Sequence, residues 1–475
     1  MLLKNKKELL PINSLNQNKS EKALVGRNPS AFFTLPLPNL ASLLMTFKQT
    51  LEFFYSQLPM FHRVGAPAYK ANLDNTLAIC KLLGSPERSF RSIHVAGTNG
   101  KGSTSHMLAS VLIESGLKTG LFTSPHLKDF RERITINGKK IPKKEVVQYT
   151  ERHRVLFSEI KPSFFEMTFG LAAWWFSLEK VNIAIMETGM GGRLDSTNVI
   201  IPELSIITNI GFDHMQFLGN TLESIAAEKA GIIKPYIPVV IGESQPETLP
   251  VFNEFAHKLN SKLYLANNNF CASNITRTRQ RVPQLKLDIL KQGKPYISNL
   301  TSPLSANYQL KNIITVIQAV EVLRQRNFEI DDYQLKSGIR HVLKNTGFKG
   351  RWQTLSLKPL TIADIGHNAD GIRQVVDQLK TVQYNKLHIV LGVVNDKDVA
   401  AMLKLFPADA TYYFCKADIP RGLDARLLAE QAKSIGLIGK VFPSVKLALE
   451  AARLAAGLND LVFVGGSAFV VAEVV

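Results

Sequence analysis

The sequence predicts an α/β protein with more than one domain. From Arg91 onward, short runs of β-branched residues alternate with helical stretches, and a second alternation of the same kind begins near residue 350. Such alternation is typical of sheets whose strands are connected by helices. The chain has 475 residues, which at about 100–200 residues per domain corresponds to two or three domains.

The composition narrows the classes of protein to which the chain can belong. The formal net charge is +18 and the basic residues are spread along the whole chain, which favours anionic partners or a merely solvated basic surface. No nucleic-acid-binding motif accompanies the charge, so we expect no nucleic-acid partner. No apolar run approaches the roughly 20 residues needed to span a bilayer, so we expect no membrane segment.

The three cysteines, Cys80, Cys271 and Cys415, lie far apart and form no C-x-x-C pair. This spacing argues against a cysteine-based zinc site and against a disulfide framework. We therefore expect a cytoplasmic protein. The sequence shows no long exposed heptad pattern, and we expect a monomer.

The first 44 residues differ from the rest of the chain. They open with KNKKELL and reach FFTLPLPNLASLL, without the charge placement and cleavage site of a secretory signal. We expect residues 1–44 to be a disordered extension or the result of an upstream start. A better amphipathic pattern begins at Met45.

The expected elements fall into two groups. The predicted strands of the first group are Ile93–Ala96, Thr119–Thr123, Val181–Met186, Leu204–Ile210 and Pro238–Ile241. Helix Ser103–Ser115 places four apolar side chains on one face and stops at Gly116. The elements predicted for the second group are strands Leu360–Asp364, Leu387–Val393, Ala410–Cys415 and Leu461–Val464 and helices Leu423–Ile435 and Val445–Ala456. Glycine and polar residues in Leu343–Arg351 interrupt both patterns, so we predict domains at residues 45–345 and 346–475.

A glycine-rich loop, Gly97–Ser103, follows the first of these strands and opens a helix. In that position, glycines allow close backbone approach and helix N-terminal N–H groups face an anion. Lys101 adds a mobile positive charge. The loop departs from the general pattern G-x-x-x-x-G-K-[ST], because Val95 occupies the first glycine position and Gly102 follows the lysine. We interpret it as a phosphate-binding loop for ATP.

Three further strands end in polar residues. Ser124, Glu187 and the pair Asp213-His214 each follow a predicted strand. Because ligands lie outside the carboxyl ends of parallel strands, we expect these residues at the same sheet edge as Lys101. Mg²⁺ bound with ATP takes hard oxygen ligands, which suits Glu187, Ser124 and also Ser103. His214 is less typical, and Asp213 alone is equally consistent with a cap or turn residue.

The second group of strands repeats this arrangement. Asp364-Ile365-Gly366-His367-Asn368 runs from a predicted strand into helix Ala369–Leu379. An acidic group beside His367 is suited to holding a substrate with an amine. Helix capping by Asn368 explains the same residues equally well.

Together these segments resemble the folylpolyglutamate synthase/dihydrofolate synthase family, within the Mur-type amide ligases. The resemblance covers nearly everything from Met45 to Val475. It rests on motifs in family order, namely GTNGKGS, TSPHL with RERI, ETGMGGRLDSTN, FDHMQFLG, EKAGIIK, YQLKN, GRW, DIGHN, DKD and GGSAFVV. It implies a parallel-sheet ATPase domain of the P-loop type and a smaller, Rossmann-like C-terminal α/β domain that ligates glutamate.

The resemblance also implies roles for individual residues. The residues implied for ATP are Thr98, Asn99, Gly100, Lys101, Gly102, Ser103, Asn312, Arg351 and Asp364. Ser124, Glu187 and His214 would hold magnesium. Lys229 resembles the family lysine that is carbamylated, although as a bare residue in helix Leu222–Gly231 it is expected to face solvent.

The substrates would lie on either side of these groups. Glutamate would be received near Asp364 and His367, which with Lys101 and Lys229 form the implied catalytic set. The residues implied for the pterin are Lys70–Leu73 and Phe165, Glu166, Met167, Thr168, Leu194, Asp195 and Ser196.

The implied reaction is a two-step ligation. ATP activates a substrate carboxylate as an acyl phosphate, and the glutamate amine then displaces phosphate. The acceptor is dihydropteroate, a reduced folate or both. Two alternatives remain at this point: a Mur-type ligase that acts on a cell-wall nucleotide precursor, and a catalytically silent protein that binds nucleotide or RNA.

Overall fold

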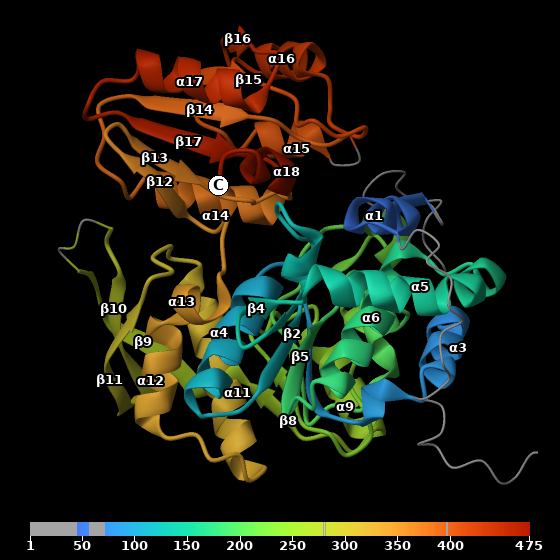
Figure 1. Ribbon diagram of the computed structural model, residues 1–475. Helices are drawn as coiled ribbons and strands as arrows, with labels where there is room; N and C mark the ends of the chain where they lie inside the picture. Colours follow the sequence, from blue (N-terminus) through green and yellow to red (C-terminus); the bar gives the residue numbers. More distant parts are fainter. Residues whose placement is uncertain (1–44, 57–71, 279, 281, 396–397) are drawn as a thin grey trace, which may run out of the picture. The chain divides into compact units, whose positions relative to one another are not determined.

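A computed structural model describes residues 45–56, 72–278, 280, 282–395 and 398–475 (Figure 1). The predicted extension at residues 1–44 lies outside the described residues. Residues 45–475 form one compact unit, so the predicted boundary near residue 345 stays a prediction. None of the described helices is long and apolar enough to cross a membrane.

The largest sheet has eight strands in the order β4-β3-β2-β5-β1-β6-β7-β8. The neighbouring strands in the run β2-β5-β1-β6-β7-β8 pair in parallel. At the other end of the sheet, β3 and β4 add an antiparallel edge. The bounds are β1 Arg91–Ala96, β2 Thr119–Phe122, β3 Ile134–Ile136, β4 Lys139–Lys140, β5 Ile183–Glu187, β6 Leu204–Ile207, β7 Val239–Ile241 and β8 Leu263–Leu265. The central strands β1, β5 and β6 are almost wholly buried, as expected of parallel strands covered on both faces.

The two faces of this sheet bury alternate residues of each strand. Ile93 and Val95 of β1 pack with the helices α4, α11 and α12, whereas Ala96 packs with α8 and α9 on the opposite face. Phe122 and Met186 pack with α5 and α6 on that same opposite face, as Figure 1 shows. The helices of this part of the chain are α1 Phe47–Ser56, α3 Asp74–Leu82, α4 Lys101–Glu114, α5 Lys143–Ile160, α6 Phe164–Leu178, α7 Met215–Leu218, α8 Leu222–Ala230, α9 Leu249–Lys258, α10 Ala266–Asn269, α11 Gln309–Gln325, α12 Asp332–Arg340 and α13 Val342–Thr346.

Smaller elements complete this part. The antiparallel strands β9 Phe270–Arg277, β10 Leu285–Lys291 and β11 Lys294–Ser302 form a three-stranded sheet in the order β11-β10-β9. The 3₁₀ helices are η3 Pro86–Arg88, η4 Phe130–Arg133 and η5 Ser196–Val199.

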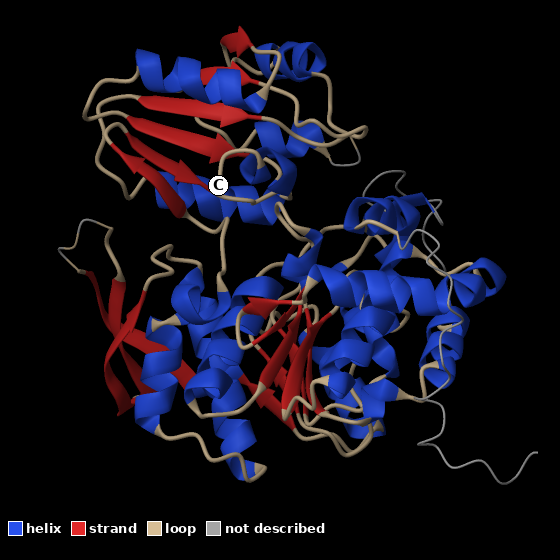
Figure 2. Ribbon diagram, viewed as in Figure 1, coloured by secondary structure: helices blue, strands red, loops and turns tan. Residues whose placement is uncertain are grey.

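The C-terminal part has its own six-stranded sheet, in the order β12-β13-β17-β14-β15-β16. The strands are β12 Gln353–Leu357, β13 Leu360–Ala363, β14 Leu387–Leu391, β15 Thr411–Phe414, β16 Gly439–Val441 and β17 Leu461–Gly465. The helices are α14 Ala369–Leu379, α15 Val399–Leu403, α16 Ala425–Lys433, α17 Val445–Ala455 and α18 Ala468–Ala472. One apolar cluster packs α14, α15 and α16 on one face and another packs α17 and α18 on the other, so helices flank the sheet on both sides (Figure 2).

The predicted fold class is therefore confirmed. No strand was named from the sequence for β3, β4, β8 to β12 or β16, and several predicted elements differ from the observed ones at their ends. The strand predicted over Leu204–Ile210 ends at Ile207. It ends there because the next residues turn to bond with the glycine-rich loop: the N–H of Thr98 donates to the carbonyl of Asn209. The helix after that loop begins at Lys101, two residues before the predicted start.

Close contact between α12 and α4 gives a test of the fold. A Cβ at Gly338 would lie 2.4 Å from Cα of Val111, so Gly338→Ala should lower the free energy of unfolding by about 1–3 kcal/mol through overpacking. Gly457→Ala is the control, because its Cβ would meet nothing closer than 3.4 Å, and it should change stability by about 0.5 kcal/mol or less. Urea denaturation measures both variants, and equal stabilities would contradict the packing.

Candidate active site

Two glycines set the shape of the phosphate-binding loop between β1 and α4. Gly97 has φ +147°, and a Cβ there would lie 1.9 Å from Oγ1 of Thr208. Gly100 has φ +85° and caps α4, and a Cβ there would lie 2.3 Å from Oδ1 of Asn312. A side chain at either position is excluded by backbone conformation and by the neighbouring group. The backbone of the loop therefore lies unusually close to the side chains of Thr208 and Asn312.

The segment Thr208–Gly211 after β6 holds this loop in place. The N–H of Asn99 donates to Oδ1 of Asn209 at 2.8 Å, and Oγ1 of Thr208 donates to the carbonyl of Asn99 at 2.6 Å. The N–H of Gly211 donates to Oγ1 of Thr98 at 3.0 Å. Thr208 and Asn209 were not among the residues predicted from the sequence. Their polar side chains directly after a buried strand are the signal that points to the same sheet edge.

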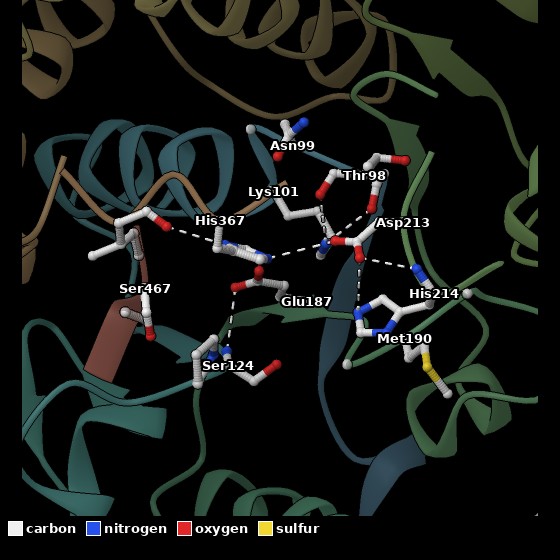
Figure 3. A pocket seen from close by; sticks show the side chains of 18 of the residues that line it. Thr98, Asn99, Lys101, Ser124, Glu187, Met190, Asp213, His214, His367 and Ser467 are labelled. Carbon is white, nitrogen blue, oxygen red and sulfur yellow. Dashed lines mark hydrogen bonds and ion pairs between the residues drawn. The ribbon is translucent and has the colours of Figure 1, made fainter. Parts of the chain in front are cut away.

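Lys101 lies folded back over the loop that it follows. Its Nζ donates to the carbonyl oxygens of Gly97 at 2.8 Å and Thr98 at 3.2 Å. Burial lowers the pKa of Lys101, and the carboxylates of Glu187 and Asp213 oppose that shift. The lysine thus lies between the phosphate loop and two carboxylates, as Figure 3 shows for Asp213.

Lys229 is buried, which corrects the expectation that the bare residue faces solvent. Only 3% of it is exposed, and its Nζ donates to the carbonyl of Gly97 at 3.1 Å. Burial and then the charge of Lys101 lower the pKa of Lys229 to about 7. The expectation was wrong because α8 packs its Lys229 side toward the loop rather than toward solvent. Two lysines therefore share one carbonyl oxygen.

The three residues predicted for the metal line one cavity with the phosphate loop. They are Ser124, Glu187 and His214. The N–H of Ser124 donates to Oε2 of Glu187 at 3.4 Å, and His214 has a left-handed backbone with φ +52° at the start of α7. Burial raises the pKa of Glu187 to about 7, against the opposing charge of Lys101.

This donor set suits a nucleotide-bound Mg²⁺ ion, which keeps several waters and takes one or two protein carboxylates. Among the described residues, no three His, Cys, Asp or Glu side chains form a metal-binding group by themselves. A cation here would thus draw on Glu187, the hydroxyl of Ser124 and the phosphates. The role of His214 as a ligand stays a prediction.

Asn368 caps α14, which is one of the two functions that the sequence left open, and it also contacts the phosphate loop. Its Oδ1 accepts from the N–H of Gly371 and caps α14. Its Nδ2 also donates to Oδ1 of Asn99 at 3.2 Å and to Oδ2 of Asp213 at 3.1 Å. Nε2 of the adjacent His367 lies 3.5 Å from the same Asp213 oxygen. The capping residue thereby ties the start of α14 to the phosphate loop.

A second cavity adjoins the phosphate loop and contains the other residues predicted for ATP. Asn99, Gly100, Ser103, Asn312, Arg351 and Asp364 line it. Oγ of Ser103 accepts a hydrogen bond from Gln309, and Asp364 accepts from the N–H groups of Trp352 and Gly366, both at 2.8 Å. Nη1 of Arg351 is buried and has no hydrogen-bond partner among the described residues.

The residues predicted for the pterin do not line either cavity. Glu166 closes a capping box with Ser163 at the start of α6, and Met167 and Thr168 are fully buried. The carboxylate of Asp195 accepts from the N–H groups of Gly189 and Met190 and so shapes a loop that does line the first cavity. Phe165 lies next to Gly189 of that loop, Leu194 precedes Asp195, and Ser196 begins the 3₁₀ helix η5. Of the predicted segment Lys70–Leu73, Lys70 and Ala71 lie outside the described residues, and Asn72 and Leu73 directly precede α3.

The first cavity also contains residues that the sequence analysis did not single out. They are Gly189, Met190, Gly191, Leu218, Val394, Arg421, Ser467, Ala468 and Phe469. Arg421 and Ser467–Phe469 follow strands β15 and β17 of the C-terminal sheet. Like Ser124 and Glu187 in the large sheet, Arg421 and Ser467 lie at or after the carboxyl ends of parallel strands, where ligands are expected.

Two family models match this chain. Residues 95–320 match the Mur ligase middle domain and residues 350–468 match the glutamate ligase domain of Mur ligases. The dihydrofolate synthase/folylpolyglutamate synthase of Bacillus subtilis is 32% identical over 85% of this chain and 94% of its own length. The chain belongs to the folylpolyglutamate synthase/dihydrofolate synthase family.

Other relatives agree with this assignment. A probable bifunctional folylpolyglutamate synthase/dihydropteroate synthase of Haloferax volcanii is 34% identical over 82% of this chain, which spans 46% of that relative's length. Escherichia coli FolC in complex with DHPP and ADP has a TM-score of 0.79 and 27% identity, over 90% of this chain and 97% of its own. A bifunctional folylpolyglutamate synthase/dihydrofolate synthase with Mn, AMPPNP and L-glutamate bound has a TM-score of 0.76 and 28% identity over the same shares.

Membership of this family makes the chain an ATP-dependent ligase that forms an amide bond. The alternative of a ligase for a cell-wall nucleotide precursor is not favoured, because the relatives are named for folate substrates. The alternative of a silent binding protein is set aside for the same reason.

The hydroxyl of Thr208 provides a test of how the loop is held. Thr208→Val removes the donor to the carbonyl of Asn99 at nearly constant shape, and a lost buried hydrogen bond costs about 1–3 kcal/mol. We expect ATP-analogue affinity to fall about tenfold, which corresponds to about 1.4 kcal/mol. Thr208→Ser retains the hydroxyl and should stay within about threefold of the wild type. Calorimetric titration measures both, and equal affinities for the two variants would refute the holding role.

Proposed function

We propose that this protein joins the α-amine of L-glutamate to a carboxylate of dihydropteroate, of reduced folates, or of both, while ATP is converted to ADP and phosphate. The observation that carries the proposal is a single cavity lined by the phosphate loop, Glu187 and Lys229 and also by His367 and Ser467 of the C-terminal part. A nucleotide, an acid and an amine can meet in such a cavity. The names of the relatives supply the substrate class.

In the first step an oxygen of the substrate carboxylate attacks the γ-phosphorus of ATP. The bond to the bridging oxygen breaks, ADP leaves, and an acyl phosphate forms. Lys101 and the N-terminus of α4 neutralise charge on the phosphates, and Arg351 adds a further cation. Glu187, Ser124 and His214 would hold the Mg²⁺ ion, which supplies charge neutralisation when bound. Bound Mn and AMPPNP in a related enzyme support the use of nucleotide and divalent metal.

In the second step the glutamate amine attacks the activated carbonyl carbon, and phosphate leaves with the former carboxylate oxygen. The attacking nitrogen loses a proton, and the His367–Asp213 pair is the proposed group that orients the amine and takes up that proton. Asp364 has three protein donors, namely Tyr308, Trp352 and Gly366. Its proposed role is therefore to position residues around it. Positioning and charge neutralisation account for most of the protein's share of catalysis.

The remaining proposals concern the pterin and the state of the protein. The loop Gly189–Gly191, shaped by Asp195 and packed against Phe165, supports a pterin site beside the first cavity. We also propose that the protein is a monomer. We propose further that it works in the cytoplasm, which the three unpaired cysteines support. The domains at residues 45–345 and 346–475 remain proposals, supported by the separate sheets.

Phosphate release with ATP, Mg²⁺ and L-glutamate tests the function directly. Release should require 7,8-dihydropteroate or a reduced folate, and it should be absent without glutamate. Lys101→Ala should abolish turnover, a loss of at least about 10²–10³-fold, because it removes a cation from the phosphates. Lys128→Ala, at an exposed position, is the control and should retain activity. Glutamate-independent release, or full activity of Lys101→Ala, would exclude the proposed reaction.

Lys229 is proposed to be carbamylated, because only a neutral amine attacks CO₂. The nitrogen forms a bond to the carbon of CO₂ and releases one proton, giving –NH–COO⁻. The folded-state pKa of about 7 makes a large fraction of this amine neutral at physiological pH. The new carboxylate would point into a cavity that already contains Lys101 and the metal-binding residues.

The carbamate gives a signal in carbon NMR after incubation with ¹³C-bicarbonate. We expect this signal in the wild type, with an occupancy that rises from pH 6 to pH 8 at fixed dissolved CO₂, because the amine loses its proton near pH 7. Lys229→Ala should lack the signal. Lys234→Ala should keep it, although Lys234 is also partly buried and donates to a carbonyl. An active enzyme without the signal would contradict the modification.

A further inference from the structure

The segment from His341 to Trp352 runs antiparallel to α4 and delivers Arg351 to the site. Nδ2 of Asn345 donates to Oε1 of Glu114, near the C-terminal end of α4, at 2.7 Å. Three residues later, the ring of Phe348 stacks on His106 in the first half of that helix, with ring centroids 4.3 Å apart and an interplanar angle of 30°. The segment is therefore attached to α4 at two points before it reaches Arg351.

The residues after Phe348 attach to the C-terminal sheet instead. The N–H of Ile365 donates to the carbonyl of Gly350 at 3.0 Å, and the N–H of Trp352 donates to Asp364 at 2.8 Å. Arg351 thus lies between the contact of Phe348 with His106 on α4 and the two hydrogen bonds made with Asp364 and Ile365 after β13. Its place relative to the phosphate loop depends on the contact with α4.

Among the described residues, no acidic side chain holds Arg351. No carboxylate of the described residues forms a salt bridge with its guanidinium, and Nη1 is buried without a hydrogen-bond partner. The positive charge of Arg351 nevertheless acts to lower the pKa of both Lys101 and Glu187, so its guanidinium lies near both side chains. When no carboxylate fixes the guanidinium, the position of this long, flexible side chain is set by the backbone that carries it.

We propose that Phe348 is a positioning residue that, by stacking on His106, fixes Arg351 beside the phosphate loop for nucleotide binding and transfer. The inference rests on the proposed function. The ring of Phe348 also lies beside the first turn of α4, since a Cβ at Gly102 would be in ordinary contact with its Cε2, at 3.7 Å. Burial and the charge of Arg351 lower the pKa of His106 to about 3, so both stacked rings are neutral at physiological pH and His106 does not repel Arg351.

A double-mutant cycle tests this coupling. Phe348→Ala should weaken binding of an ATP analogue about tenfold and also lower kcat, whereas in the Arg351→Ala background the same change should cost less than about twofold. Phe348→Trp retains a stacking ring and should restore most of the affinity. Leu343→Ala, at an exposed position of the same segment, is the matched control and should leave affinity and kcat unchanged.

The outcomes separate this inference from the proposed function. An equal loss of affinity in both backgrounds, or no loss, would overturn the positioning role. If Phe348→Ala does not fold, Phe348→Leu serves in the same cycle, because it keeps apolar volume but removes the ring stack. Analogue binding needs no pterin and no glutamate. The cycle is therefore decided even if glutamate-dependent phosphate release, which tests the proposed function, fails.

Discussion

A buried lysine, Lys229, and a partly buried one, Lys101, donate to the same carbonyl oxygen, that of Gly97, and the surrounding site is organised by this contact. Two ammonium groups at one acceptor repel each other, and burial raises the cost of both charges. The carbonyl can accept both lysines because Gly97 has no side chain and its backbone adopts φ +147° against Thr208. The nearby carboxylates of Glu187 and Asp213 oppose the fall in the pKa of Lys101, whereas Lys229 moves to a pKa of about 7.

The order of the strands determines which acidic and polar side chains lie near the ammonium groups of Lys101 and Lys229. β1 lies between β5 and β6, so Glu187 at the end of β5 and Thr208–Asp213 after β6 flank the loop that follows β1. Glu187 supplies a carboxylate and Asn209 fixes the orientation of Asn99. From the C-terminal sheet, His367 and Asn368 meet Asp213. The charge of one loop is thus balanced by strand ends that are far apart in the sequence.

The sequence allowed this edge to be predicted, because parallel strands deliver their carboxyl ends to one side and Ser124, Glu187 and His214 each follow a strand. It did not allow Lys229 to be placed, since the apolar residues of α8 do not say which neighbour its lysine meets. Thr208 and Asn209 were missed because the strand was expected to continue to Ile210. Glu166, Met167 and Thr168 were assigned to substrate from the family resemblance, and their burial in α6 could not be predicted because it depends on packing between layers that periodicity does not specify.

The charges that line the first cavity explain why an anion and a cation would bind together. Among the described residues that line it, Lys101, Lys229, Arg351 and Arg421 are basic and Glu187 and Asp213 are acidic. With every one of these groups ionised the wall carries four positive and two negative charges, a net +2 that favours a triphosphate. With Lys229 as a carbamate it carries three of each. In such a neutral wall, Glu187 and the new carboxylate would be the groups that hold the Mg²⁺ ion, and Lys101 would neutralise the phosphates. Carbamylation of Lys229 would thus change the charge of the wall by two units. It would favour the metal-bound nucleotide, the form that phosphoryl transfer to a carboxylate requires, over the free nucleotide.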